Sequence, residues 1–355
     1  MTRIVLLLLP ALLFLSACEG DPTVPIPGDP IGQVVNGIYV LSEGNFGDPE
    51  GARLSLYDLD RDTVYGDVFE RSNNGMHLGS LGDDIKISDG KLYVLMSGSE
   101  NLSIVSTSDH GLLQSATYSG AVPHDLLIDP ARGRIYMTML FSGSILGVDL
   151  FTLQPVDTFL VGSNPQGVLL LNDRLFVCNT GFGSDKTVSI INLPGDSVES
   201  TLTLSDGPTG IVQGPDGRVW VSCTGNSFGA PPTTGAVYML NPFSLAIEDS
   251  IMFLENLWGA IAVGNDGSVY LLGATTGSFY GGPVHRLAPG TYAVTLNYID
   301  GTFYGMAVDP STGNLHVTDV RNLAGEGEVQ VFDMSATLVA SFPASRGPAA
   351  FAFKH

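Results

Sequence analysis

Residues 125–162 read DLLIDPARGRIYMTMLFSGSILGVDLFTLQPVDTFLVG, and this stretch contains one complete repeat of the chain. Residues 125–128 form an apolar segment that runs into the turn sequence 129–133, where Asp, Pro and Gly favour a tight hairpin. Three more short segments follow at 134–138, 144–149 and 155–161. The pattern predicts four antiparallel strands, which is the unit of a β-propeller blade.

Seven segments of the chain share a short apolar strand with a large ring at its centre. They recur at intervals of 40 to 54 residues, a period typical of propeller blades. We therefore predict an all-β, seven-bladed β-propeller with four-stranded antiparallel blades, and we expect the central rings to pack between blades. The central residues are Tyr39, Tyr93, Tyr136, Phe176, Trp220, Tyr270 and His316.

The two ends of the repeat region predict how the ring closes. The first unit begins at its second strand, residues 37–42, with no inner strand before it. Residues 347–353 form an extra apolar strand with no blade after it. We expect this C-terminal strand to close the first blade, because closure removes two open sheet edges that would invite aggregation.

The N-terminus predicts export. Arg3 precedes an apolar run over residues 4–15, too short to span a bilayer, and the run ends in Leu-Ser-Ala-Cys at 15–18. This ending resembles the lipobox of bacterial lipoproteins, and that resemblance implies lipidation of Cys18. The alternative is an ordinary secretory signal. Under the lipoprotein interpretation, residues 1–17 are the signal peptide, residues 18–33 are the lipidated cysteine with a Pro-rich tether, and residues 34–355 form the propeller.

The tether and the charge of the chain bear on location and partners. Pro22, Pro25, Pro27 and Pro30 favour an extended tether of about 40 Å. Glu19, rather than Asp, follows Cys18, which favours an outer-membrane address, with exposure at the cell surface left open. The formal net charge of −21 repels nucleic acid and anionic lipid, so we expect no nucleic-acid partner and membrane contact through the anchor alone.

Residues that could carry chemistry are few. None of the six histidines forms an H-x-x-x-H or H-x-H pair, and we predict no catalytic residue, no metal and no cofactor. The acidic residues at 83–84 and 125 are expected near the mouth of the central channel, where a carboxylate cluster could bind Ca²⁺ or act in a hydrolase. The alternative is that they are solvated turn residues that cap strands. Cys178 and Cys223 fall in consecutive blades and could form a disulfide or remain two buried thiols.

The loops expected on one face of the ring are rich in aromatic and amide side chains. Exposed loops normally avoid large apolar residues, so this inventory suits a large amphiphilic ligand. The alternative is that the aromatic rings fold inward and plug the channel. The candidate ligand-binding residues are Asn45, Phe46, His77, His124, Asp125, Phe141, Gln166, Phe182, Phe228, Trp258, Phe279, Tyr280, Phe303, Tyr304, Arg321 and Arg346.

Two passages carry a resemblance to a known family. Residues 39–47 read YVLSEGNFG, and residues 74–83 read NGMHLGSLGD before the strand at 91–94. From residue 36 onward the chain resembles the YncE-like seven-bladed propellers. Within them it looks most similar to surface lipoproteins that capture cobalamin beside a TonB-dependent outer-membrane transporter. This resemblance implies a ligand contact for the loops at 43–47 and 77–83, and a transporter as partner.

The leading hypothesis is a non-enzymatic binding protein that captures a corrinoid, or another large nutrient, and passes it to a transporter. Trp258, Phe303 and Tyr304 would stack on the ligand, while amides and Arg321 would meet its polar periphery. The alternatives are a scaffold for an envelope protein, a metal-dependent lactonase-like hydrolase using the channel acids, and, with least support, a quinone-dependent dehydrogenase.

Overall fold

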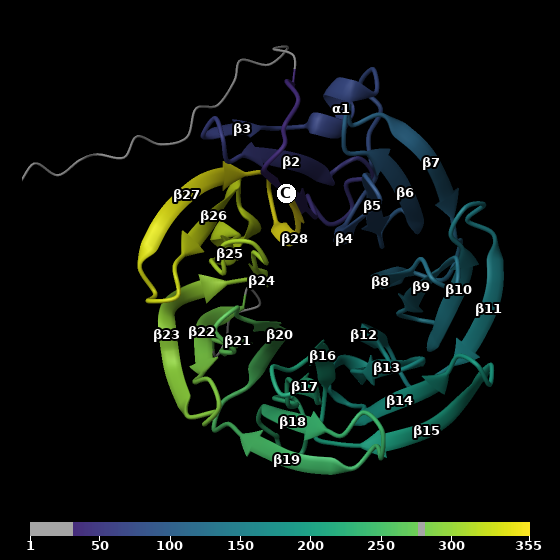
Figure 1. Ribbon diagram of the computed structural model, residues 1–355, viewed down its shortest axis with the longest axis vertical. Coiled ribbons are helices and arrows are strands. Elements are labelled where there is room, and N and C mark those ends of the chain that lie inside the picture. Colours follow the sequence, from purple (N-terminus) through teal and green to yellow (C-terminus); the bar gives the residue numbers. More distant parts are fainter. Residues whose placement is uncertain (1–30, 276–280) are drawn as a thin grey trace, which may run out of the picture.

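The computed structural model describes residues 31–275 and 281–355 (Figure 1). The predicted signal peptide, Cys18 and residues 18–30 of the tether lie outside the described residues, as do Phe279 and Tyr280. In the described part of the chain, no helix is both long enough and apolar enough to cross a membrane.

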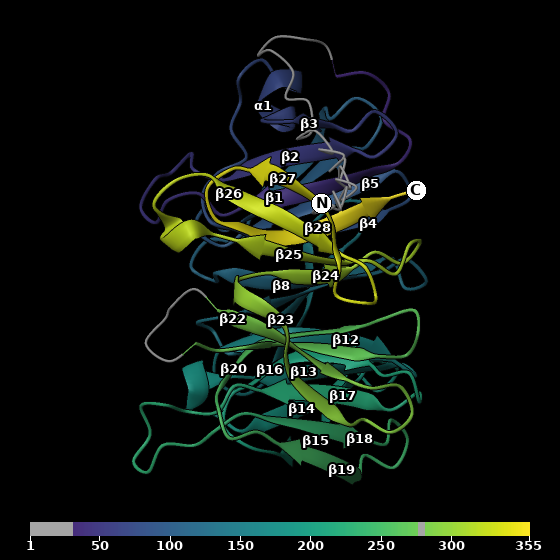
Figure 2. The same cartoon turned by 90° about the vertical axis from the view of Figure 1, so that its left-hand side faces the viewer.

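Seven four-stranded antiparallel sheets stand around a common axis, so the predicted all-β seven-bladed propeller is confirmed (Figure 1). Figure 2 shows the ring from its side. Blade 1 combines the C-terminal strand with the first three strands of the chain, and each later blade is built from four consecutive strands.

The strands of blades 1 to 4 follow, from the axis outward. Blade 1 contains β28 (Pro348–Lys354), β1 (Gly37–Ser42), β2 (Arg53–Asp58) and β3 (Thr63–Tyr65). Blade 2 contains β4 (Gly82–Ser88), β5 (Lys91–Met96), β6 (Asn101–Ser106) and β7 (Leu112–Thr117). Blade 3 contains β8 (Pro123–Asp129), β9 (Arg134–Met139), β10 (Ser144–Asp149) and β11 (Pro155–Leu160). Blade 4 contains β12 (Pro165–Leu171), β13 (Arg174–Asn179), β14 (Thr187–Asn192) and β15 (Ser197–Thr203).

Blades 5 to 7 follow the same order. Blade 5 contains β16 (Pro208–Gln213), β17 (Val219–Cys223), β18 (Ala236–Leu240) and β19 (Ile247–Met252). Blade 6 contains β20 (Leu257–Val263), β21 (Val269–Gly273), β22 (Gly282–Leu287) and β23 (Val294–Phe303). Blade 7 contains β24 (Met306–Val308), β25 (Leu315–Asp319), β26 (Gly327–Phe332) and β27 (Leu338–Ala344). Three short helical turns complete the described elements: α1 (Val68–Ser72), η1 (Gly181–Gly183) and η2 (Arg321–Leu323).

The seven central rings are all buried, which confirms their predicted place in the core. Trp220 is the largest of them, and its indole N–H donates to Asp216 Oδ1 at 3.0 Å, so burial leaves its one polar atom satisfied. His316 packs edge-on against Phe351 and Phe353 of β28, with ring centroids 6.0 and 5.1 Å apart. It therefore behaves as a packed core ring rather than a ligand.

The C-terminal strand closes the ring as predicted. β28 pairs antiparallel with β1, with Gly37 opposite Lys354 and Leu41 opposite Ala350. On its other side, Lys354 Nζ donates to the carbonyl of Thr107 at 2.7 Å, which ties the last strand to blade 2. Closure therefore rests on a full set of strand pairings together with contacts to blades 2 and 7.

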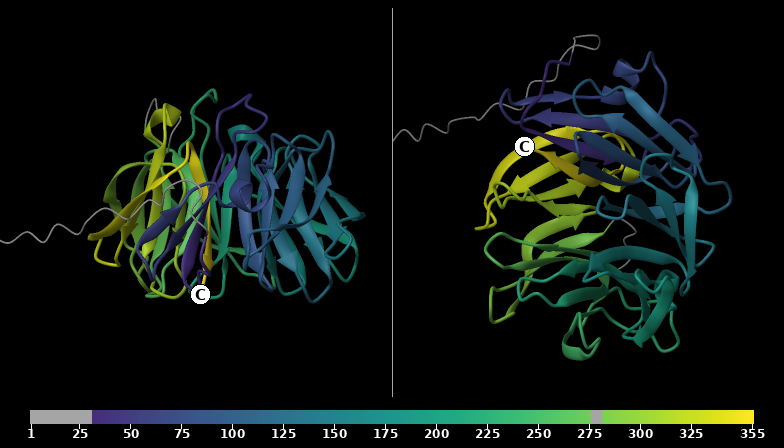
Figure 3. Two further views of the ribbon diagram at one scale, coloured as in Figure 1. Left: turned by 90° about the horizontal axis from the view of Figure 1, so that it is seen from above. Right: turned by 45° about the vertical axis from the view of Figure 1, so that its right-hand side comes forward.

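Strand direction defines two faces. The connections from an outermost strand to the next inner strand, and those from the second to the third strand of each blade, lie at the same end of the ring. We call this end the top face. It carries the longer loops, opposite the C-terminus (Figure 3, left), so each blade contributes two loops to one surface.

We predict that removing residues 348–355 prevents stable folding, because it leaves the edge of β1 unpaired and uncovers His316. Circular dichroism melts and size-exclusion chromatography would show loss of the cooperative transition and aggregation. A variant lacking only His355 is the matched control: it loses the contact with Asp309 at 2.9 Å but keeps the strand, so it should still unfold cooperatively, at a melting temperature lowered by only a few degrees. An unchanged melting temperature for the longer deletion would contradict the closure account.

Candidate functional site

The inner strands carry β-bulges at their top ends, where pairing with the second strand shifts by one or more residues. A bulge leaves a residue unpaired and re-aims its side chain. In six of the seven blades, a bulge therefore presents a side chain to the same end of the ring axis. The shifts fall at residues 82–84 in β4, 123–126 in β8, 165–168 in β12, 208–210 in β16, 257–261 in β20 and 348–350 in β28.

Six blades thus present Asp83, His124, Gln166, Thr209, Trp258 or Ala349 at this level. Tyr304 has the matching position in blade 7, because it and Gly305 both bond to Thr318 just ahead of β24. Blade 1 offers only the small Ala349 at its bulge, so its contribution comes instead from Glu43, in the β1–β2 connection. We call the seven larger side chains the axial ring, and all of them are partly exposed: Glu43, Asp83, His124, Gln166, Thr209, Trp258 and Tyr304.

One side of the axial ring is aromatic. The rings of Trp258 and Tyr304 lie 5.7 Å apart at an interplanar angle of 52°. Tyr304 Oη donates a hydrogen bond to Glu43 Oε1 at 2.9 Å, and the Glu43 N–H donates to the carbonyl of Gly347 at 2.8 Å. The closing segment of the chain therefore fixes Glu43 beside the aromatic pair.

The other side is acidic. Asp83 accepts a hydrogen bond from the Ser97 N–H at 3.1 Å, and its Oδ1 lies 3.9 Å from His124 Nε2. Burial, and then the charge of Asp83, raise the pKa of Glu43 to about 7, against the lowering effect of the Tyr304 hydrogen bond. Burial also raises the pKa of Asp83, which His124 and the bond from Ser97 offset in part. The two carboxylates thus disfavour each other's ionisation.

A second acidic group lies one residue further along β4 and β8. Asp84 pairs with Lys86 Nζ at 2.5 and 2.6 Å, and Lys86 lies 3.8 Å from Asp125. Asp84 accepts the N–H of Leu126 and Asp125 accepts that of Val168, which ties blade 2 to 3 and blade 3 to 4. The pKa of Asp84 is lowered because Lys86 outweighs its burial, whereas burial and the charge of Asp84 raise that of Asp125. Asp125 therefore has a structural role that the sequence did not indicate.

The rim of the top face carries exposed aromatic side chains. Phe46 and Phe228 are 92% and 88% exposed at the tips of their loops. Phe141 and Phe182 come from neighbouring blades, and their ring centroids lie 6.2 Å apart. They did not fold inward to fill the ring axis, which was the alternative to ligand contact.

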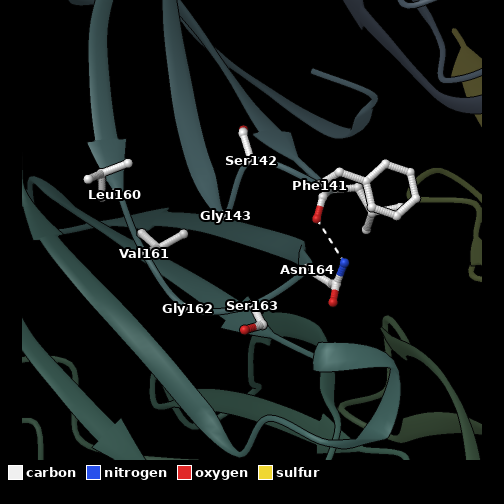
Figure 4. Close-up of a pocket in the computed structure, with 9 residues that line it drawn as sticks. Phe141, Ser142, Gly143, Leu160, Val161, Gly162, Ser163 and Asn164 are labelled. Carbon is white, nitrogen blue, oxygen red and sulfur yellow. Dashed lines mark hydrogen bonds between the residues drawn. The ribbon is translucent and has the colours of Figure 1, made fainter. Parts of the chain in front are cut away.

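Phe141 also lines a surface pocket of about 440 Å³ between blades 3 and 4 (Figure 4). Leu160, 75% exposed, and Asn164 line it as well. Asn164 Nδ2 donates to the carbonyl of Leu140 at 2.9 Å, so the loop that carries Phe141 is held in place.

Other candidate residues lie elsewhere. Phe303 was expected to stack on a ligand, but it is buried in the core beside Phe332, with centroids 6.3 Å apart, so its ring does not reach the surface. His77 sits between Glu50 and Glu70, at 3.4 and 3.7 Å.

The two candidate arginines have partners on the top face. Arg321 lies 3.7 Å from Glu328. Arg346 donates to Asn45 Oδ1 and to the carbonyl of Ala324. Asn45 and Arg346 are therefore brought together, at the corner between blades 7 and 1.

The remaining motifs show no catalytic geometry. Cys178 and Cys223 are buried free thiols, and burial raises the pKa of both. Within residues 31–275 and 281–355, no three His, Cys, Asp or Glu side chains converge as metal ligands. Residues 225–229 read GNSFG, which matches the G-x-S-x-G sequence of hydrolases. They connect two antiparallel strands, whereas a nucleophile elbow joins a strand to a helix.

A family model described as "Domain of unknown function (DUF5074)" matches residues 36–347. No curated protein matches the sequence. Among solved structures, a quinonprotein alcohol dehydrogenase-like protein from Bacteroides thetaiotaomicron is 16% identical, with a TM-score of 0.68 over 90% of this chain and 78% of that one. A catalytically inactive variant of virginiamycin B lyase from Staphylococcus aureus is 14% identical, with a TM-score of 0.58 over 77% of this chain and 92% of that one. At these identities the likeness shows the fold alone.

The raised pKa of Glu43 makes a prediction about stability. The folded protein disfavours the ionised form of Glu43, because the pKa of this carboxyl is higher in the folded state than in the unfolded state. The free energy of unfolding should therefore fall as pH rises from about 4.5 to 7. Glu43→Gln removes this cost and keeps an acceptor for Tyr304. We expect almost no gain at pH 4.5 and a gain of about 3 kcal/mol at pH 8, measured by thermal melts.

Glu326→Gln, at an exposed position of another top-face loop, is the control and should shift the melting temperature by less than about 1 °C at either pH. An equal effect of Glu43→Gln at both pH values would show that Glu43 is not a strained carboxyl.

Proposed function

The chain belongs to the DUF5074 family, and we propose that it is a lipid-anchored extracytoplasmic binding protein that captures a large nutrient of the corrinoid class on its top face. In this proposal the protein then passes the nutrient to an outer-membrane transporter. The lipobox-like sequence at 15–18 supports the anchor, and the passages at 39–47 and 74–83 support the ligand class.

One observation carries the proposal: the axial ring gathers a side chain from every blade at one end of the molecule. Trp258 and Tyr304 offer flat apolar surface, and Gln166, Thr209 and Asp83 offer hydrogen-bonding groups around it. A corrinoid has a broad macrocycle edged by carboxamides, which is the complementary chemistry. Because blade closure fixes the ring residues, little conformational entropy is lost on binding.

The rim would extend the contact. Phe46, Phe141, Phe182 and Phe228 stand around the axial ring at loop tips, where large apolar residues cost solubility unless something covers them. In the proposed complex these rings contact the ligand's outer parts or the transporter that receives it.

A second candidate function is acid–base catalysis. Glu43 interacts with Asp83, and its pKa is raised to about 7, so its carboxyl could move a proton near neutral pH. The structural neighbour named as a lyase supports this candidate only through its fold. Turnover of a bound ester or lactone that is lost in Glu43→Gln would favour it over capture.

We predict that Trp258→Ala weakens cyanocobalamin binding more than tenfold, because it removes the aromatic surface on which the macrocycle would stack. Isothermal titration calorimetry on protein lacking residues 1–18 measures this directly. Phe243→Ala is the matched control, since Phe243 is 69% exposed on the opposite face. No binding by the parent protein would rule out the corrinoid assignment, and equal affinities in parent and Trp258→Ala would remove Trp258 from the site.

A further inference from the structure

We propose that the axial ring recognises an organic cation, an ammonium group on the ligand, which sits between the carboxylates of Glu43 and Asp83 and the faces of Trp258 and Tyr304. This inference rests on the proposed function, because it assigns the chemical group that enters the same site. It concerns only this one subsite and leaves the rest of the ligand open.

The aromatic half of the site is the first support. Trp258 is half-buried, and its ring is tilted at 52° to that of Tyr304, so the pair forms a corner rather than a flat stack. An ammonium group within about 6 Å of such rings is attracted by their negative faces, most strongly by tryptophan. Trp220, the only other tryptophan, is fully buried and takes no part.

The acidic half is the second support. Throughout the described ranges, neither Glu43 nor Asp83 forms an ion pair with a lysine or arginine. Lys86 pairs with Asp84 and Asp125, and Arg346 donates to Asn45 and Ala324. His124 faces Asp83 at 3.9 Å, and its buried Nδ1 has no hydrogen-bond partner. The two carboxylates therefore have no lysine or arginine to neutralise them, and a cationic ligand group could do so.

The charge of the whole chain is the third support. A formal net charge of −21 gives the molecule a negative field that attracts small cations and raises their rate of encounter. The same field opposes an anionic ligand group at the centre of the top face. Both the axial-ring carboxylates and the net negative charge of the chain therefore favour a positively charged ligand group.

The carboxylates also make binding depend on pH. The negative charge of Asp83 disfavours ionisation of Glu43. A cation between the two carboxylates would favour their ionised forms, so binding should release a proton from Glu43. Tyr304 donates to Glu43 throughout, while Asp84, Lys86 and Asp125 lie below and remain paired. Affinity for a cation should therefore increase with pH.

The test uses choline and its uncharged carbon analogue 3,3-dimethylbutan-1-ol, titrated into the full chain in dodecyl maltoside. Quenching of Trp258 fluorescence reports occupancy, since Trp220 is buried, and calorimetry in two buffers counts protons. We expect choline to bind at least tenfold tighter than the alcohol, and at least tenfold tighter at pH 8.5 than at pH 5.5. Glu43→Gln, which keeps the acceptor for Tyr304, should weaken choline at least fivefold and flatten its pH dependence.

Equal affinity for the two probes, no choline binding, or binding that ignores pH would overturn the inference. Cyanocobalamin, titrated into the same samples, separates it from the proposed function. Cyanocobalamin binding without choline binding would leave capture standing and remove the cation subsite. Choline binding without cyanocobalamin binding would leave the cation subsite and remove the corrinoid.

Discussion

The pairing of β28 with β1 is the interaction on which the rest of the molecule depends. It joins the first and last strands of the propeller and gives blade 1 the inner strand that would otherwise be missing beside β1. It also continues upward into the top face, where the Glu43 and Gly44 N–H groups donate to the carbonyls of Gly347 and Arg346. The segment that closes the ring therefore also positions Glu43 beside Tyr304.

The axial ring follows from the same architecture. Six of the seven inner strands are bulged at their top ends, so most of the ring residues belong to the sheets, while Glu43 and Tyr304 lie just beyond strand ends. The arrangement has an energetic cost, because two partly buried carboxylates interact unfavourably and neither has a lysine or arginine partner in the described ranges. Proteins commonly keep such costs at binding sites, where a ligand relieves them.

The sequence predicted the fold well, because blade repeats leave local signals. Turn residues, alternating strands and one large ring per blade were enough to place the blades and the closing strand. The bulges were harder, since they depend on pairing between strands. Even so, the ring residues of blades 2 to 7 precede their blade's central ring by 10 to 12 residues, a regular spacing that could have grouped Thr209 with the others. The burial of Phe303 and the blade-linking role of Asp125 depend on contacts with other blades, which sequence spacing does not reveal.

The central claim is that the top face, around the axial ring, binds the ligand. Hydrogen–deuterium exchange of the protein with and without cyanocobalamin tests it most directly, because exchange reports on every loop at once. The account predicts added protection at residues 43–52, 79–84, 121–125 and 256–259, with none at the opposite-face loops 241–246 and 288–293. No protection at the top face, or protection confined to the opposite face, would contradict it.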